Sequence, residues 1–407
     1  MGALPGLTAT TAVTLFIPVS FTLPFAAAIG LIIGLYKGAI FGGSISAISF
    51  GVPGTPAAGA TILDGYQLTQ RGQGRKALET GLYSSIVGDT ASDLFTIFVA
   101  PLVIGVALMF GPSERFWLMA LAIILIGALT GKHFFKGLLS AAIGIFIAMI
   151  GTDPMSGASR LTFGVWWLGD GIGLIPLLIG IFAMPTMFQE ASSLLFERAK
   201  GKTQEKAVSP WKIGKGLSFR EFWSLRKEIA IGTTVGTFVG LLPGIGASVA
   251  AFLSYAVNKQ VSPEKQLGTG KIEGVAAAES ANNATCGPTL VPLIAFGIPG
   301  SSIAALVGAA LMLQGVRMGP GVMDLHPDKI YALFMLLILA NVFNLLIGRF
   351  FCGLYVALAQ SPKALIIPTI LAMAVIGTYA TQLNPYHIIM LVGAGLLGYI
   401  MLLTDIP

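Results

Sequence analysis

The sequence is poor in charged residues, which occupy only 10% of its 407 positions. Soluble domains carry about a quarter. Hydrophobic residues make up 55% of the chain, and the mean hydropathy is +0.84. A chain with so little polar surface cannot cover a water-facing globule. The composition therefore predicts a polytopic protein of the lipid bilayer, and its long apolar runs predict an all-α fold.

Cysteine and histidine are also scarce, with two and three copies. Cys286 and Cys352 both lie in apolar surroundings, which argues against a disulfide framework. The histidines are scattered and form no metal-binding pattern. A P-loop motif is missing as well, so ATP binding is not indicated. We expect no cofactor, and no metal other than Na⁺ as a candidate coupling ion.

Apolar runs long enough to cross a bilayer fill most of the chain. Two further stretches, 3–20 and 276–315, are apolar but interrupted by Gly, Pro, Ser and Asn, which predicts broken or re-entrant helices. Together they give roughly ten to twelve membrane segments. The uninterrupted candidates are 24–50, 77–110, 114–131, 134–151, 170–188, 228–256, 328–360, 362–380 and 386–403.

One long polar stretch, residues 189–227, divides the chain into a first transmembrane half (1–188) and a second (228–407). It is rich in lysine and arginine, and basic loops of membrane proteins lie in the cytoplasm. The smaller basic cluster at residues 71–76 should lie on the same side. These loops largely explain the net charge of +6, so no nucleic-acid partner is implied.

The two halves contain the same short sequence motifs in the same order. LPGLTATTA from Leu4 matches LPGIGASVA from Leu242, and FGVPGT from Phe50 matches FGIPGS from Phe296, the second pair at an offset of 246 residues. We call residues 50–55 the first PG box and residues 296–301 the second. Such a pattern indicates a duplicated gene. By analogy with secondary transporters, we expect the halves to be inverted repeats.

Each PG box predicts a helix break at membrane depth. Proline ends or kinks a helix, and irregular backbone persists in a bilayer only against protein or a water-filled site. A helix that starts after the box presents N–H groups and the positive end of its dipole, which favours an anionic substrate. The alternative is a pair of simple proline kinks in packed helices. The substrate-binding residues expected here are Ser44, Pro53, Gly54, Thr55, Pro56, Pro299, Gly300, Ser301 and Ser302.

The segment AAAESANNATCGP is the most polar run between apolar segments. Polar groups at membrane depth usually mark ion or substrate paths, and oxygen ligands suit a hard cation such as sodium. We expect Glu279 and Ser280 to couple the ion, and Asn282 and Asn283 to contact substrate. Small and polar residues that hold helices together are the alternative interpretation.

Three charged residues of the first half complete the candidate site. At the offset of 246 residues, Lys37 corresponds to Asn283. Lys37 is predicted either to contact a substrate carboxylate or to stand in for a coupling cation, and the alternative is that it snorkels to an interface. Asp89 and Asp93 share one helix face and are candidates for ion coupling, through a shared proton or cation. A structural pair with Lys or Arg is the competing prediction.

The motifs LPGLTAT, YKGAIFGGSISAI, GVPGTPAAGATILDGYQLTQRGQGRKAL, LPGIGAS, EGVAAAESANNATCG and GIPGSSIAALVGAALMLQGVRMGP resemble the large membrane subunit of tripartite tricarboxylate transporters (the TctA-like family). The resemblance is strongest over about residues 2–320. Lys37 departs from it, because an aromatic residue is expected there. Both ends look shortened relative to the family, so a fragment is expected.

The resemblance implies a multi-pass protein of the bacterial inner membrane that takes up tricarboxylates or dicarboxylates using a Na⁺ or H⁺ gradient. It also implies two partners, a small four-helix membrane subunit and a periplasmic solute-binding protein. Two alternatives remain: a stand-alone organic-acid symporter, and a membrane scaffold or receptor that transports nothing. We expect no enzyme, because the chain shows no catalytic dyad or metal cluster.

Overall fold

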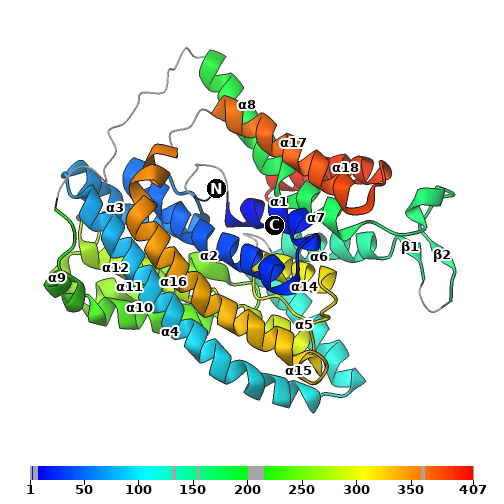
Figure 1. The fold of residues 1–407 in the computed structure, drawn as a ribbon, viewed down its shortest axis with the longest axis horizontal. Coiled ribbons are helices and arrows are strands. Elements are labelled where there is room, and N and C mark those ends of the chain that lie inside the picture. The colour runs from blue at the N-terminus through cyan, green and yellow to red at the C-terminus, as the bar shows by residue number, and fades with distance from the viewer. Residues whose placement is uncertain are drawn as a thin grey trace.

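The architecture comes from a computed structural model that describes residues 2, 8–130, 134–153, 156–199, 215–358 and 363–406. It is almost entirely helical, as predicted (Figure 1). A short antiparallel ribbon pairs β1 (Gly151–Thr152) with β2 (Ser159–Arg160). The α-helices are α1 (Ala9–Phe21), α2 (Phe25–Phe50), α3 (Gly59–Gln70), α4 (Gly74–Leu108), α5 (Pro112–Thr130), α6 (Phe134–Ala148), α7 (Leu174–Phe182), α8 (Met184–Ala199), α9 (Phe219–Ser224), α10 (Arg226–Gly240), α11 (Gly246–Val261), α12 (Ile272–Ala284), α13 (Leu290–Phe296), α14 (Ser302–Leu313), α15 (Val322–Leu325), α16 (Pro327–Leu358), α17 (Lys363–Gln382) and α18 (Tyr386–Leu403).

Within the described residues, five helical segments are long and apolar enough to cross a bilayer: 25–50, 74–108, 174–195, 327–354 and 386–403. Four shorter apolar helices accompany them. The protein is therefore an all-α polytopic membrane protein, while the count of ten to twelve segments and the inverted repeat remain predictions. With 35 residues, α4 spans about 50 Å, more than the roughly 30 Å hydrocarbon core, so it must tilt or project.

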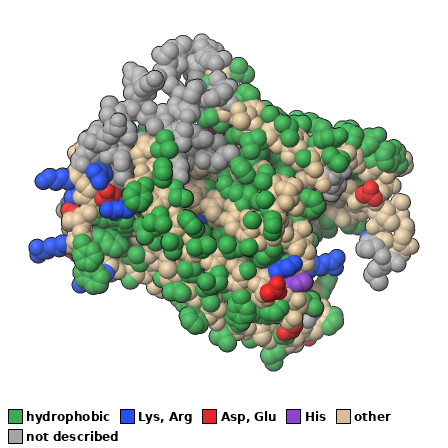
Figure 2. Space-filling model, viewed as in Figure 1, with side chains coloured by type: hydrophobic (Ala, Val, Ile, Leu, Met, Phe, Trp, Pro, Cys, Tyr) green, Lys and Arg blue, Asp and Glu red, His purple; other side chains and the backbone are tan. Residues whose placement is uncertain are grey.

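The outer surface matches the expected contact with lipid (Figure 2). Large apolar side chains on α4 and α16 point outward, among them Phe98 and Phe350, each 73% exposed. In water such a surface would drive aggregation, whereas hydrocarbon tails solvate it.

The predicted breaks are present at the two PG boxes, whereas the described residues of the stretch 3–20 belong to one uninterrupted helix, α1, with Pro18 inside it. The stretch 276–315 divides into α12, α13 and α14, as expected. Two predicted spans differ from the structure. The span 228–256 divides into α10 and α11 at the second LPG box, because proline cannot continue the hydrogen-bond ladder there. The span 170–188 becomes α7 and α8, and α8 continues into the predicted linker 189–227. The first LPG box, residues 4–6, and linker residues 200–214 lie outside the described residues.

Helix α12 lies at the centre of the molecule, between α4 and α10. Glycines permit this close packing: a Cβ atom added at Gly88 on α4 would lie 2.5 Å from the Ser280 carbonyl oxygen, and Gly232 and Gly236 on α10 approach α12 in the same way. Small residues let membrane helices approach closely. The consequence is that every α12 residue from Gly274 to Ala284 is buried, including its polar ones.

Beside α12, helices α2, α4 and α16 run next to one another (Figure 1). They form a three-helix wall that brings the first half against the second.

The two basic segments meet at one end of the molecule. Lys76 donates to Glu221 at 2.7 Å, and this hydrogen bond lowers the pKa of the Glu221 carboxyl to about 2. The Leu217 N–H donates to Glu79 at 2.6 Å. Residues 71–76 and the linker residues 217–221 therefore share one side, as the positive-inside rule predicts for two cytoplasmic loops.

At the same end, Asp64 ties α3 to the second half. Its buried carboxylate accepts hydrogen bonds from the Tyr255 hydroxyl at 2.7 Å and from three backbone N–H groups, those of Gly268, Gly270 and Lys271. One side chain thus orders the loop that leads into α12.

Replacing this side chain should destabilise the protein. In Asp64→Ala the N–H groups of the loop lose a charged acceptor, and we expect a loss of about 3 kcal/mol in the free energy of unfolding. Thermal unfolding of the purified protein in detergent measures the change. Glu264→Gln, an exposed residue nearby, is the control and should unfold like the wild type. Equal stability of Asp64→Ala and the control would contradict this role.

Candidate functional site

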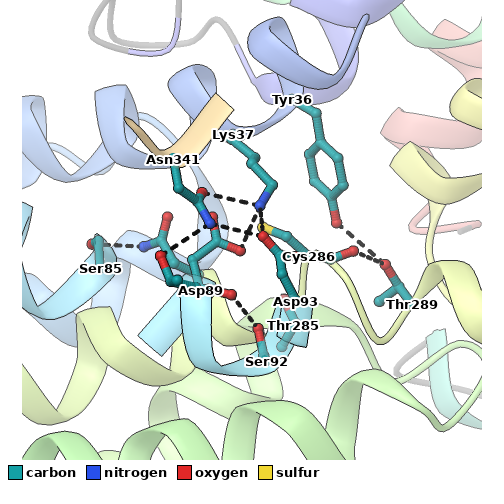
Figure 3. A network of polar contacts seen from close by, with 12 residues as sticks. Tyr36, Lys37, Ser85, Asp89, Ser92, Asp93, Thr285, Cys286, Thr289 and Asn341 are labelled. Carbon is teal, nitrogen blue, oxygen red and sulfur yellow. Dashed lines mark hydrogen bonds and ion pairs between the residues drawn. The ribbon is translucent and has the colours of Figure 1, made fainter. Parts of the chain in front are cut away.

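Lys37, on α2, lies in a buried network formed with α4 and α16 (Figure 3). Its ammonium donates to Asp89 Oδ1 and to Asn341 Oδ1, both at 3.0 Å, and it also pairs with Asp93. The Asn341 amide donates in turn to Asp93 Oδ2 at 2.7 Å. We call these four residues the lysine cluster. Each of them is at most 2% exposed.

The lysine cluster settles two of the alternatives left by the sequence. Lys37 does not snorkel to an interface, because its side chain is only 1% exposed. Asp89 and Asp93 form the structural ion pair with a lysine that competed with ion coupling. Their role in coupling is untested and stays a prediction. Two carboxylates against one ammonium leave a formal charge of −1, and Asp89 Oδ2 and Asp93 Oδ1 are buried without a hydrogen-bond partner.

A second polar cluster surrounds Glu279, the fully buried carboxylate of α12. Ser44 on α2 donates to Glu279 Oε2 at 2.6 Å and Ser85 on α4 donates at 3.2 Å, while Thr61 on α3 donates to Oε1. Asn283, one turn along α12, donates to Ser85 Oγ at 2.7 Å. We call these five residues the glutamate cluster. All three hydroxyls come from the first half and the carboxylate from the second.

The glutamate cluster contains no positive side chain. Within the described ranges Glu279 forms no ion pair, and its stabilisation comes from hydroxyl and amide donors. The amide oxygen Oδ1 of Asn283 is also buried without a partner. A buried carboxylate without a counter-charge is costly, so its charge must be balanced by a bound cation or by a proton.

The two PG boxes share one backbone geometry. Gly51 ends α2 and Gly297 ends α13, both in the left-handed region with φ of 68° and 74°. The N–H of Gly54 then donates to the Gly43 carbonyl at 3.2 Å, and the N–H of Gly300 donates to the Thr289 carbonyl at 3.3 Å. In both boxes the acceptor lies eleven residues upstream. The boxes are therefore helix breaks of the same design.

These hydrogen bonds correct one expectation. The N–H groups of Gly54 and Gly300 are not free to bind an anion, because each already donates to a carbonyl. Burial in a bilayer explains this, since an unpaired backbone N–H there costs several kcal/mol. The Ser301 hydroxyl is also engaged, as the N-cap of α14 that accepts from the Ala304 N–H. The Thr55 hydroxyl remains buried without a partner.

Each box is linked to one of the two polar clusters through a residue next to the cluster in the sequence. Gly43, the acceptor of the first box, precedes Ser44 of the glutamate cluster. Thr289, the acceptor of the second box, lies 3.3 Å from the hydroxyl of Tyr36, which precedes Lys37 (Figure 3). Because Tyr36 and Gly43 are two turns apart on α2, about 10 Å separates these two junctions.

The second LPG box joins this arrangement, since Gly244 N–H donates to the Gly300 carbonyl at 3.1 Å.

Several expected site residues lie apart from both clusters. Ser280 donates to the Ala276 carbonyl of its own helix and packs against Gly232 of α10. Asn282 is 1% exposed, and neither atom of its amide has a partner. Pro53, Pro56 and Ser302 are exposed at their boxes, while Pro299 is partly exposed.

Sequence reasoning missed Thr61, Ser85 and Asn341, which complete the two clusters. Asn341 carried a usable signal, because side-chain amides inside an apolar run such as 328–360 are unusual at membrane depth. Ser85 carried a weaker one, since it lies one helical turn before Asp89 on the same face. Thr61 carried none: a threonine in a polar helix is unremarkable until Glu279 is seen to approach it.

A groove of about 620 Å³ runs beside the lysine cluster, between α2 and α16. Its walls are glycines of α2, such as Gly34 and Gly38, and apolar side chains of α16, such as Leu339 and Phe343. The lining does not match a carboxylate substrate, so we do not place the anion there.

The fold and its buried charges define a multi-pass membrane protein built around charged side chains at its centre. The model of the tripartite tricarboxylate transporter TctA family matches residues 1–407, and the chain belongs to that family. A similar protein is the "Uncharacterized 52.8 kDa protein in TAR-I ttuC' 3'region" of Agrobacterium vitis, 30% identical over 403 residues, which are 99% of this chain and 79% of the relative.

A second relative is the "Uncharacterized protein in TAR-II ttuC' 3'region" of the same organism. It is 34% identical over 168 residues, 41% of this chain and 69% of the relative. No solved structure matches the chain. Family membership makes the chain a component of a tricarboxylate transporter and places it outside the enzyme families.

The lysine cluster predicts a large effect of removing its only cation. Lys37→Met leaves two buried carboxylates facing each other, and we expect a loss of about 3–5 kcal/mol in stability. Thermal unfolding in detergent reports the change. Lys271→Met, an exposed lysine, is the matched control. The triple variant Lys37→Met/Asp89→Asn/Asp93→Asn should recover much of the loss, and a Lys37→Met protein as stable as the control would refute the ion pair.

Proposed function

We propose that the chain is the large membrane subunit of an ion-gradient-driven secondary transporter for organic carboxylates, tricarboxylates or dicarboxylates, in the bacterial inner membrane. It works with a periplasmic solute-binding protein that delivers substrate and with a small four-helix membrane subunit. The family supports the general class. The ion, the partners and the substrate range are parts of this proposal.

The observation that carries the proposal is the buried charge at the centre of an apolar molecule. Glu279, Asp89 and Asp93 give three carboxylates against the single ammonium of Lys37. Ionisable groups at membrane depth are expensive and usually serve ion or substrate movement. A net negative centre attracts Na⁺ or H⁺, so it supports cation coupling. An ATP-driven mechanism has no support in the sequence, which lacks a P-loop.

The PG boxes are the proposed binding site for the carboxylate. Helix α14 starts directly after the second box and directs the positive end of its dipole toward it. The Thr55 hydroxyl, buried without a partner, is available to donate to a substrate oxygen at the first box. Exposed Pro53, Pro56 and Ser302 show that the boxes are not sealed by side chains. Asn282, also without a partner, is a further candidate contact.

The structure also supports a physical route for coupling. Ser44 donates to Glu279, and its neighbour Gly43 accepts from Gly54 of the first box. A cation or proton that binds Glu279 changes the hydrogen bond that Ser44 donates. Because Gly43 is next to Ser44, this change also alters the hydrogen bond that Gly43 accepts from the first box. Binding at one site thereby alters the other, which is the requirement for coupled transport.

Uptake into proteoliposomes tests this function. We expect radiolabelled citrate to accumulate under an inward Na⁺ or H⁺ gradient when the chain is reconstituted with the small subunit and the loaded binding protein. Glu279→Gln should lower gradient-driven uptake at least tenfold, because it removes the charge that the cation balances.

The control is Glu273→Gln on the same helix, whose carboxylate is only 3.9 Å from Lys265 near the surface. It should transport normally, since surface ion pairs contribute little. Uptake by the chain without its binding protein would favour the stand-alone symporter. Citrate binding without uptake under either gradient would favour a scaffold or receptor and contradict the proposal.

A further inference from the structure

The backbone of the two PG boxes agrees with the offset of 246 residues over residues 43–54 and 289–300. Gly51 and Gly297 adopt the same left-handed conformation, and Gly54 and Gly300 donate to carbonyls at the same upstream distance. At this offset Lys37 is the counterpart of Asn283. Equivalent positions of the repeat therefore carry an ammonium in the first half and a neutral amide in the second.

Lys37 and Asn283 also approach the same face of α4. Ser85, Asp89 and Asp93 follow one another at intervals of four residues and thus form one stripe. The ammonium of Lys37 reaches Asp89 and Asp93, while the amide of Asn283 reaches Ser85 at 2.7 Å. Ser85 of the glutamate cluster and Asp89 and Asp93 of the lysine cluster therefore lie on consecutive turns of α4 (Figure 3).

The two clusters differ in how their negative charge is balanced. In the lysine cluster, the oxygens of Asp89, Asp93 and Asn341 surround a cation that belongs to the chain. In the glutamate cluster, comparable oxygens surround no basic side chain. They are the Glu279 carboxylate and three hydroxyls; the Asn283 amide directs its nitrogen to Ser85, and its oxygen is buried without a partner, so a rotated amide could offer that oxygen instead.

We propose that the glutamate cluster binds an exchangeable Na⁺, and that the Lys37 ammonium is its covalently tethered equivalent in the first half. The ligands would be Glu279, Asn283 and the hydroxyls of Ser44, Thr61 and Ser85. Each hydroxyl now donates to Glu279 but also has lone pairs that it can turn toward a cation. One carboxylate balances one positive charge, which favours a monovalent ion over Ca²⁺ or Mg²⁺, and oxygen ligands suit hard cations.

This assignment deepens the proposed function by naming the coupling ion and its ligands, and it gives Lys37 a purpose. A tethered ammonium permanently offsets one of the two carboxylate charges and cannot be transported. The first half therefore binds no Na⁺ of its own. The chain needs one Na⁺ at these two sites, whereas two sites without a lysine would need two.

Direct binding of Na⁺ tests the glutamate cluster without any transport. The purified chain is titrated with NaCl in detergent at constant ionic strength held with choline chloride, and its thermal midpoint and binding heat are recorded. We expect a saturable rise of the midpoint with Na⁺. Glu279→Gln should raise the apparent Kd at least tenfold, whereas Glu273→Gln should bind like the wild type. A wild type that does not respond to Na⁺, or an unchanged response in Glu279→Gln, overturns the site.

Lys37→Asn tests the tethered cation, because it installs the counterpart residue of the second half. Losing the ammonium leaves Asp89 and Asp93 as ligands for a second Na⁺. The number of Na⁺ ions bound per chain should rise from about 1 to about 2, and Na⁺ should restore stability to the variant. Lys37→Arg keeps the charge and should stay near 1.

If Lys37→Asn does not fold, the double variant Lys37→Asn/Asp93→Asn serves the same test. Its cluster has a formal charge of −1, as in the wild type, instead of the −2 of Lys37→Asn. A stoichiometry that stays near one Na⁺ per chain in the folded variant contradicts the tethered cation.

The outcomes separate this inference from the proposed function. Saturable Na⁺ binding at Glu279 without citrate uptake would leave the cation site standing and refute the transport proposal. Citrate uptake driven only by a proton gradient, with no Na⁺ binding, would support transport and overturn the cation site.

Discussion

The structure depends on the pairing of Lys37 with Asp89 and Asp93 at the centre of the helix assembly. Three charges lie at most 1% exposed in a protein whose outer surface is apolar. Each charge alone would cost several kcal/mol to bury, so α2 and α4, which supply them, and α16, which supplies Asn341, have to meet in one arrangement. The pairing therefore fixes α2 and α4 of the first half against α16 of the second.

Helix α12 extends this arrangement to the PG boxes. Glycines of α4 and α10 allow these two helices to close around α12, which places Glu279 among hydroxyls of α2, α3 and α4. The same residues that hold the halves together also adjoin the two boxes, through Ser44 beside Gly43 and through Tyr36 on Thr289. Structural support and the proposed coupling thus use the same contacts, so a change at one cluster has a path to both breaks.

Much of this fold could be predicted from the sequence, because helices that cross a bilayer are visible in the sequence as long apolar runs. The breaks at Pro53 and Pro299 were predicted from proline and glycine alone. The break at the second LPG box was not, although Pro243 carried the same signal, because the flanking apolar residues concealed it within one long run. Side-chain partners were the least predictable. Thr61 and Glu279 are separated by more than 200 residues, and the sequence around either one gives no indication that the two side chains are in contact.

The central claim is that charge at the heart of the protein is balanced by one tethered ammonium and one exchangeable Na⁺. High-resolution maps of the purified protein in NaCl and in choline chloride would test it most directly. The account predicts a peak in contact with Glu279 and Asn283 in NaCl that is lost in choline, with Lys37 held between Asp89 and Asp93 in both. Identical maps, or a Lys37 side chain that leaves its two carboxylates, would contradict it.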